Sequence, residues 1–287
     1  DFVTAMYSSS QVTLTAEQEA EIRAYYTQDQ GFGQYLARLA SLDWGYSYAF
    51  LTPVSALFLE ALPWTLLLLG GAHLVSLAIG FTAGVEAAWR RGRVEKGLVS
   101  GMTVLEGLPE IGTGVVLLAV FALNLEWFPA AGAQTAYAQG SWWSWLADVG
   151  LHLALPLATL VLAYFPGNFL LTRASMVMVI KQPFVSTARA KGLPSRRIRY
   201  AHAARNALLP LVTRFGLRLA FMVTGALVVE TMFSYPGLGT LLFNAIQVRD
   251  LPLIQAIVLI SSLIILAVNL GLEMVYRVID PRIGHAS

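Results

Sequence analysis

The sequence predicts an all-α polytopic membrane protein, and three observations lead to this prediction. The chain of 287 residues is 56% hydrophobic and only 13% charged, whereas an ordinary soluble domain carries about 25% charged residues. Its apolar residues are gathered into long runs, and about 20 such residues suffice to cross a bilayer as a helix. Lys and Arg are concentrated in some of the intervening segments, as they are in cytoplasmic loops.

Residues 1–60 are the least apolar part of the chain and are predicted to form an external segment before the membrane domain at 61–287. Thr15 is followed three positions later by Gln18, which fits the capping box at the start of a helix. Helices are therefore expected at 16–26 and 33–40, as a surface layer outside the membrane.

Five segments are predicted to span the membrane. They are residues 61–85, 97–125, 150–171, 208–233 and 251–276. The first contains Gly80 and Gly84, a spacing that lets another helix approach closely. Residues 126–147 lack Lys and Arg and contain four Trp, so they are predicted to be an outer loop at the membrane interface.

The second span contains an unusual polar group, Glu106, Pro109 and Glu110. Pro109 should kink the helix, and the two acids, one turn apart, should share a face. A carboxylate facing lipid is costly, so both acids should face protein or water. Two interpretations stay open: these residues line a substrate path, or the acids pair with Arg214 or Arg218 on a neighbouring span.

A basic block, 181–210, separates the third and fourth spans. It holds seven of the nineteen Lys and Arg residues and no acidic residue. Pro183 suits a first helical turn, Gly192 a left-handed helix end, and Pro194 the start of a second helix. We expect a short helix, a sharp turn after Gly192, and a second helix that continues into the fourth span. Two interpretations of this block stay open. It is a solvated loop whose charge only sets the orientation of the protein in the membrane, or it is a docking site for another protein.

Charge distribution predicts the topology. The basic segments lie between the first and second spans, in 181–210 and at the C-terminal end, which places the C-terminus in the cytoplasm. Five spans then place the N-terminal segment outside.

The sequence lacks the residues and motifs that are characteristic of several classes of enzyme and metal-binding protein. The chain has no Cys, and it contains no phosphate-binding loop, zinc-protease motif or nucleophile elbow. We therefore expect no enzyme activity, no metal site and no cofactor bound by this chain. The two acids of the second span leave two functions open at this point. One is an intramembrane enzyme with Glu106 and Glu110 as its paired acids, although the sequence places no nucleophile beside them. The other is a cation channel in which these acids select ions.

The basic block resembles a known element. It carries, in order, Thr187-Ala188-Arg189-Ala190-Lys191-Gly192, Arg196-Arg197, His202-Ala203, Arg205-Asn206 and Ala207-Leu208-Leu209-Pro210. This pattern is similar to the cytoplasmic EAA loop of ABC-importer permeases of the dipeptide, oligopeptide and nickel branch. Ser186 stands where the general family consensus has Glu.

Further matches extend the resemblance over nearly the whole chain. They are Asp43, Gly45 and Ser47; Pro53 and Val54; Glu230-Thr231-Met232-Phe233; Pro236-Gly237-Leu238-Gly239; and Asp280-Pro281-Arg282. One departure is at Glu110, where the family has an aromatic residue after a Ser-Pro pair. The family has one more span ahead of this point, six in total, so the resemblance implies that a first span is absent from this chain.

The resemblance implies one of two homologous permease subunits of an ATP-driven importer in the bacterial inner membrane. Its partners would be a second permease, two cytoplasmic ATPases, which would bind the ATP and Mg²⁺, and an external substrate-binding protein. The coupling helix that docks on an ATPase would comprise Ser186, Thr187, Ala188, Arg189, Ala190, Lys191 and Gly192. Peptides are the expected substrates, with nickel or another small solute as the alternative.

Overall fold

The computed structural model describes residues 33, 37, 41, 43–47, 49–136, 140–220 and 227–279. Helices dominate these residues, as expected for an all-α membrane protein. The helices predicted at 16–26 and 33–40 lie outside the described residues, except Gly33 and Ala37, which are both helical. The Asp280-Pro281-Arg282 motif also lies outside them.

Within the described residues, three helices are long and apolar enough to cross a membrane. They comprise Val54–Arg90, Trp142–Val179 and Leu251–Gly271, and a bent helix pair between residues 93 and 124 raises the number to four. The predicted fourth span, 208–233, contains residues 221–226, which are not described. The structure therefore agrees with a polytopic helical protein, while the span predicted at 208–233 stays a prediction.

The first membrane helix is continuous through α4 (Val54–Thr65), the π-helical turn η1 (Leu66–Gly70) and α5 (Gly71–Arg90). It begins at Val54 rather than at the predicted Ala61. The predicted close contact at Gly80 and Gly84 is confirmed: a Cβ at either glycine would lie 2.7 Å from the Cβ of Asn168 or Thr172, respectively, on α8.

The second predicted span is broken. It consists of α6 (Arg93–Glu106), α7 (Glu110–Leu117) and the π-helical η2 (Leu118–Asn124), and the two halves meet at 93°. Pro109 precedes α7 with an extended ψ of 136°, and proline also drives the residue before it out of helical geometry. The predicted kink is therefore a complete break. At its other end, α6 is tied to α8 because Glu95 Oε1 accepts a hydrogen bond of 2.6 Å from Arg173 Nη2.

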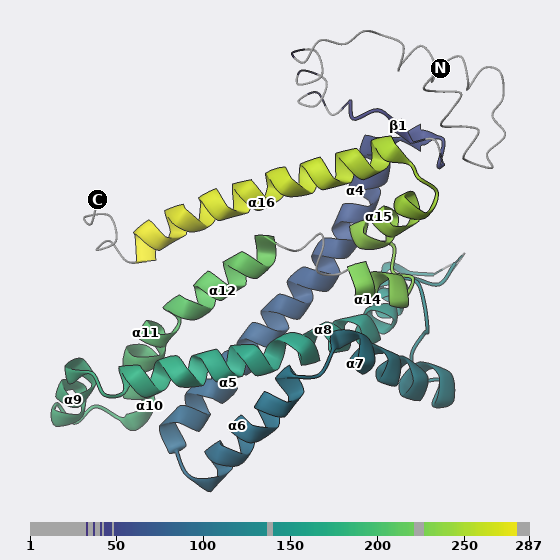
Figure 1. Cartoon of the computed structure of the whole chain (residues 1–287). Coiled ribbons are helices and arrows are strands. Elements are labelled where there is room, and N and C mark those ends of the chain that lie inside the picture. The colour runs from purple at the N-terminus through teal and green to yellow at the C-terminus, as the bar shows by residue number, and fades with distance from the viewer. Residues whose placement is uncertain are drawn as a thin grey trace, which may run out of the picture.

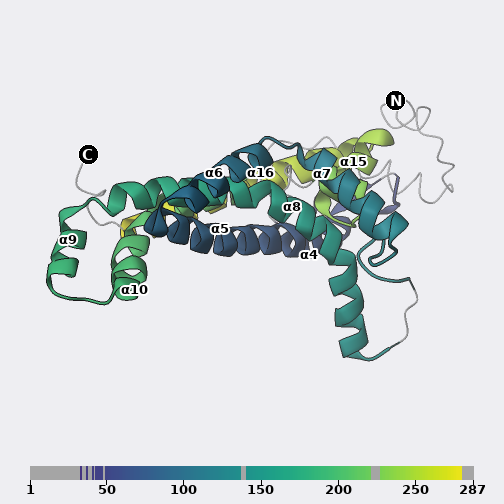
Figure 2. The same ribbon diagram turned by 90° about the horizontal axis from the view of Figure 1, so that it is seen from below.

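The third helix, α8 (Trp142–Val179), is longer than the predicted 150–171. The Ser141 side chain caps its first turn by accepting from Ser144 N–H, so the exposed tryptophans expected in a loop lie in a helix instead. Pro156 and Pro166 lie inside α8, and its first turns point away from the other helices in Figure 2. The expected bending of this helix is thus observed.

The basic block forms a helical elbow. Its elements are α9 (Pro183–Ala190), α10 (Ser195–Arg197), η3 (Ile198–Ala204, π-helical) and α11 (Arg205–Ala207). A break at Leu208 separates α11 from α12 (Leu209–Ala220). After the residues that are not described come α14 (Leu227–Met232), α15 (Leu238–Gln247) and α16 (Leu251–Ile279).

A small hairpin precedes α4. Strands β1 (Tyr46–Ser47) and β2 (Thr52–Pro53) pair antiparallel. The buried Asp250 carboxylate holds this hairpin, because it accepts hydrogen bonds from Ser47 Oγ at 2.5 Å and Ala49 N at 3.1 Å. Asp250 also accepts from Leu253 N in the first turn of α16, so one side chain joins the hairpin to that helix.

The elbow and the hairpin lie at opposite ends of the molecule (Figures 1 and 2). Helix α5 packs along α8 over the largest helix–helix contact among the described elements. One buried apolar cluster joins α4, α15 and α16 at the hairpin end, and another joins α5, α8, α9 and η3 at the elbow end. The C-terminal part of α16 points toward the elbow end.

Candidate functional site

The turn of the elbow has the predicted geometry. Pro183 occupies the first position of α9, which ends at Ala190. Gly192 follows with a φ of +69°, the left-handed conformation that glycine adopts without steric cost. The Leu193 N–H donates to Ala188 O at 3.3 Å, which closes the turn, and the second helix starts at Ser195.

The underside of the elbow is apolar and packs against the chain itself. Val185 and Ala188 are buried in a cluster with Ile198 and Ala203 of η3 and Met176 of α8. Ala188, predicted as a docking residue, is buried by these contacts and also belongs to the lining of the groove beside α9. Its methyl group helps to fix the packing of α9.

The other predicted coupling residues are exposed. They are Ser186, Thr187, Arg189, Ala190, Lys191 and Gly192. Beside them lies a groove of about 300 Å³ whose lining includes Phe184, Thr187, Lys191 and His202. The elbow thus presents a basic surface with an apolar recess, which is a suitable shape for contact with another protein.

Trp89, near the end of α5, holds both arms of the elbow. Its indole Nε1 donates to Ser195 Oγ at 3.2 Å. The guanidinium carbons of Arg189 and Arg199 lie 5.5 and 5.4 Å from its ring centroid, within the range of cation–π attraction. Arg189 belongs to α9 and Arg199 to η3, so a single aromatic ring contacts both helices.

Glu86, one turn before Arg90 on α5, is the second anchor of the elbow. Its Oε1 pairs with Arg199 Nη1 and accepts from the Tyr200 hydroxyl at 2.7 Å. Its Oε2 pairs with Arg90 Nε at 3.1 Å. Burial of the hydroxyl and its bond to Glu86 raise the pKa of Tyr200, so Tyr200 is a neutral donor near pH 7.

The acidic group of the second span lies at the break. Glu106 is the last residue of α6, Pro109 precedes α7 and Glu110 is the first residue of α7. The prediction that the two acids share a helical face is wrong, because the helix that would define that face turns by 93° between them.

Glu106 forms an ion pair across three helices. Its Oε1 lies 3.6 Å from Arg214 Nη2 of α12, and Arg214 Nη1 donates to Gly167 O of α8 at 3.0 Å. A Cβ at Gly167 would overlap Arg214 and lie 2.6 Å from Glu106 Oε1. The pairing interpretation therefore holds for Glu106, and the absence of a side chain at Gly167 makes room for it.

Glu110 has no such direct ion pair among the described residues. It is partly buried near Arg218, and the Arg218 guanidinium carbon lies 4.4 Å from the ring centroid of Tyr164 on α8. Arg218 Nη1 is buried without a hydrogen-bond partner. The break thus brings two acids and two arginines together, and the described residues include no group of three side chains suited to holding a metal ion.

Sequence comparison identifies the family to which these features belong. Residues 76–285 match the family model described as binding-protein-dependent transport system inner membrane component, and this range includes the elbow and the break. The chain belongs to this family. The family is one of transport components, in agreement with the resemblance of the elbow to the EAA loop.

Relatives extend the similarity beyond the family model. The chain is 35% identical over 275 residues to the oligopeptide transport system permease protein AppB of Bacillus subtilis, covering 94% of this chain and 86% of AppB. It is 36% identical over 261 residues to the glutathione transport system permease protein GsiC of Pectobacterium atrosepticum, covering 88% and 79%. It is 34% identical over 278 residues to the di/tripeptide transport system permease protein DppB of Pseudomonas aeruginosa, covering 89% and 81%.

One buried network was not anticipated. The fully buried Glu230 accepts from Thr65 Oγ1 at 2.7 Å and from Gly239 N at 2.7 Å, and Thr65 Oγ1 in turn accepts from Leu238 N at 2.8 Å. A Cβ at Gly237 would overlap the Glu230 carboxylate. Both family motifs, around Glu230 and around Gly237, are visible in the sequence. That their residues contact each other is visible only in the structure.

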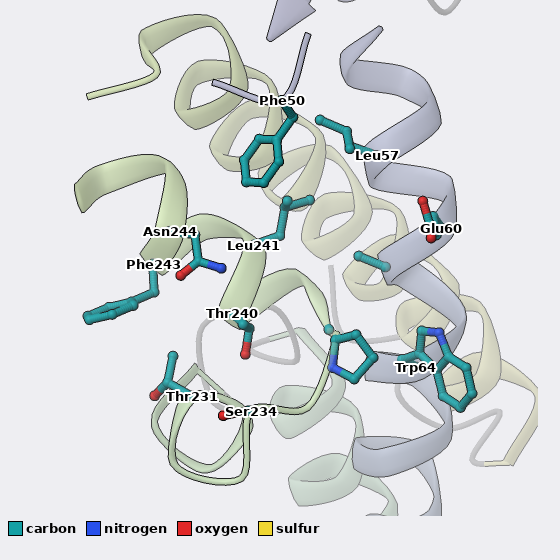
Figure 3. Close-up of a pocket in the computed structure, with 13 residues that line it drawn as sticks. Phe50, Leu57, Glu60, Trp64, Thr231, Ser234, Thr240, Leu241, Phe243 and Asn244 are labelled. Carbon is teal, nitrogen blue, oxygen red and sulfur yellow. The ribbon is translucent and has the colours of Figure 1, made fainter. Parts of the chain in front are cut away.

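A pocket of about 470 Å³ lies next to this network at the hairpin end of the molecule, and Gly237 is part of its lining. Figure 3 shows Phe50 between two walls, with Leu57 and Glu60 of α4 on one side and Thr240 and Asn244 of α15 on the other. The pocket was missed because α15 itself was not predicted.

Proposed function

We propose that this chain is one of two permease subunits of an ATP-driven importer of peptides. Membership in the family supports the transport role. The substrate class is supported by the names of AppB, GsiC and DppB, which refer to oligopeptides, glutathione and di/tripeptides. The chain itself is not an enzyme in this proposal and binds no cofactor, since ATP and Mg²⁺ belong to partner subunits.

The observation that carries the proposal is the exposed basic face of the elbow. We place α9 and its turn in a groove of a cytoplasmic ATPase, with Ser186, Thr187, Arg189, Ala190, Lys191 and Gly192 as the contact residues. Ala188 contributes by fixing α9 from beneath. A docking element needs a rigid base, and the Trp89 and Glu86 contacts supply one.

The same contacts suggest how motion of an ATPase reaches the membrane. Displacement of α9 would pull η3 and α11, which lead through Leu208 into α12. The same displacement would be transmitted to α5 through the contacts of Glu86 and Trp89. An elbow fixed to two membrane helices can shift both of them as rigid bodies, and the ATPases bias which of the two states is populated.

The translocation path in this proposal passes the break at Glu106, Pro109 and Glu110. Arg214 lies on α12, so movement of this helix would alter the Glu106 pair. The Glu106–Arg214 ion pair would then form in one state of the transporter and weaken in the other, which would change the lining of the path.

We further propose five spans in this chain, with the elbow and the C-terminus in the cytoplasm, and an external segment before α4. The concentration of Lys and Arg in the elbow favours that side. The orientation of α16, whose C-terminal part points toward the elbow end, agrees with it. The remaining partners are a second permease and an external binding protein.

The proposal is tested by reconstituting the chain with its partner permease, ATPases and binding protein in proteoliposomes. The expected result is peptide accumulation that requires both ATP and the binding protein. Ion conductance without ATP, and no peptide uptake, would indicate a channel and contradict the proposal.

A further inference from the structure

The pocket at the hairpin end has a wall suited to a cation. Glu60 and Trp64 are one turn apart on α4, and both line the pocket. Glu60 is exposed, and no hydrogen bond or ion pair occupies its carboxylate within the described part of the chain. A pocket wall that carries a carboxylate and an aromatic ring can attract an ammonium group by charge and through the ring face.

The opposite wall is suited to a peptide group. Thr240 and Asn244 are one turn apart on α15, and both line the pocket. Thr240 Oγ1 is buried and has no hydrogen-bond partner, although buried polar atoms are nearly always paired. A hydroxyl and a side-chain amide together can bond both the C=O and the N–H of a bound peptide.

The charge of the pocket is one-sided. Glu60 is the charged side chain of the lining, and the described lining residues include no Lys, Arg or His. A ligand carboxylate would meet no cation here and would be repelled by Glu60. The amino end of a peptide therefore suits this pocket, and its carboxyl end does not.

The two walls are fixed relative to each other. Thr65, the neighbour of Trp64, bonds both Glu230 and Leu238 N at the start of α15. The Trp64 ring packs edge-on against the buried Tyr235, with ring centroids 5.9 Å apart. The spacing between the walls is thus set by buried contacts, and a preformed site loses less entropy on binding than a flexible one.

We propose that this pocket is a subsite for the amino-terminal residue of the transported peptide, in which Glu60 binds the α-ammonium group. Thr240 and Asn244 bond the first peptide group, and the aromatic lining, which includes Phe50 and Trp64, contacts the first side chain. The inference rests on the proposed peptide import. The new element is that the permease itself, and not only the external binding protein, binds the free amino group of the peptide.

The test uses the complete transporter in proteoliposomes and two probes, alanyl-phenylalanyl-alanine and its N-acetyl derivative. In the Glu60→Gln variant, uptake of the free peptide should fall about tenfold, the scale of one hydrogen bond between charged groups. Uptake of the acetylated peptide should not change. Because both transporters use the same binding protein, its own selectivity cancels in the comparison.

Glu126→Gln is the matched control, since Glu126 is exposed and lies outside the pocket lining. It should leave uptake of both peptides at the wild-type level. Copurification of all subunits with the Glu60→Gln chain checks assembly. Equal effects of Glu60→Gln on the two peptides, or no effect on either, would overturn the inference. If the wild-type transporter imports neither peptide, the proposed function fails first, and the inference with it.

Discussion

Gly192 ends the first arm of the elbow with a backbone angle that few residues adopt. Its φ is +69°, and no heavy atom lies within 4 Å of the position a Cβ would take. Space is therefore not the constraint at this position. The left-handed backbone alone costs an ordinary residue about 1–2 kcal/mol, while Asn tolerates it.

Gly192→Val should therefore uncouple transport from ATP hydrolysis without reducing the amount of assembled complex. A branched side chain moves the turn out of its left-handed geometry, which shifts α9 relative to η3. Peptide uptake and ATP hydrolysis in proteoliposomes measure the coupling. Gly192→Asn is the control and should retain transport. A loss of the same size in both variants would show that the surface of the turn matters rather than its geometry.

At Glu230 a buried carboxylate acts as a structural residue. It accepts two backbone N–H groups, from Gly239 at 2.7 Å and Thr240 at 3.2 Å. These groups belong to the first turn of α15, where helical N–H donors lack partners within the helix. Glu230 thus caps α15, and the absence of a side chain at Gly237 lets the carboxylate come near.

The elbow as an element depends on contacts from α5 as well as on its own sequence. Arg199 and Tyr200 of η3 converge on Glu86, and Arg189 and Arg199 flank Trp89. The side chain of Arg199 is only 17% exposed, so its pair with Glu86 is less screened by solvent than a surface pair. The elbow is consequently attached to α5 at two adjacent turns.

Glu86→Gln should lower the number of peptides imported per ATP hydrolysed, because it removes the charge that holds Arg199. Measurement of both rates in one preparation gives this ratio. Arg90→Gln removes the second arginine that pairs with Glu86. The Arg90 side chain is 79% exposed, and exposed ion pairs contribute little to stability. This variant should leave the ratio near the wild-type value. A ratio unchanged in Glu86→Gln would exclude this link between the elbow and α5.

The break between α6 and α7 positions the Glu106–Arg214 pair against α8. Gly114 of α7 packs against Thr159 of α8, where a Cβ would lie 3.1 Å from Thr159 Cγ2. Both halves of the broken helix therefore contact α8, and the ion pair connects the first half to α12.

Glu106→Gln and Arg214→Gln should each destabilise the detergent-solubilised protein, since each leaves one charge without its partner at the junction of α6, α8 and α12. The double variant should regain part of the loss, because contacting residues are energetically coupled. Thermal unfolding of the four proteins measures this coupling. Strictly additive losses would mean that the two side chains do not interact.

At the scale of the whole molecule, the two candidate sites lie at opposite ends of the same helices (Figure 1). The first membrane helix carries Glu60 and Trp64 near its start and Glu86 and Trp89 near its end. It therefore connects the pocket wall to the anchors of the elbow. A movement of the elbow can reach the pocket through this helix and α8, against which it packs.

Local sequence rules predicted the elements that depend on single residues. Pro183 and Gly192 indicated the elbow, and Gly80 and Gly84 indicated the close packing of α5 on α8, because backbone geometry and close approach restrict residue choice. Those rules failed where tertiary contacts decide. Pro109 indicates a bend but not its size, which also depends on how both halves pack on α8.

Two features of the candidate sites could not be read from the sequence. The ten residues of α15 follow a turn-rich segment and form less than a span, and their capping by Glu230 depends on folding. The inward orientation of Ala188 depends on how α9 packs on η3. The sequence motif therefore located the elbow but did not separate its surface from its underside.

Site-specific crosslinking tests directly whether the elbow contacts an ATPase. The chain contains no Cys, so a single Ala190→Cys substitution gives one reactive site on the exposed face of α9. Ala136→Cys, in the exposed segment before α8, is the control. In the assembled transporter, Ala190→Cys should crosslink to an ATPase subunit with a yield that changes on ATP binding, and Ala136→Cys should not. A cysteine at position 190 that stays fully reactive toward a soluble maleimide and forms no crosslink would contradict the account.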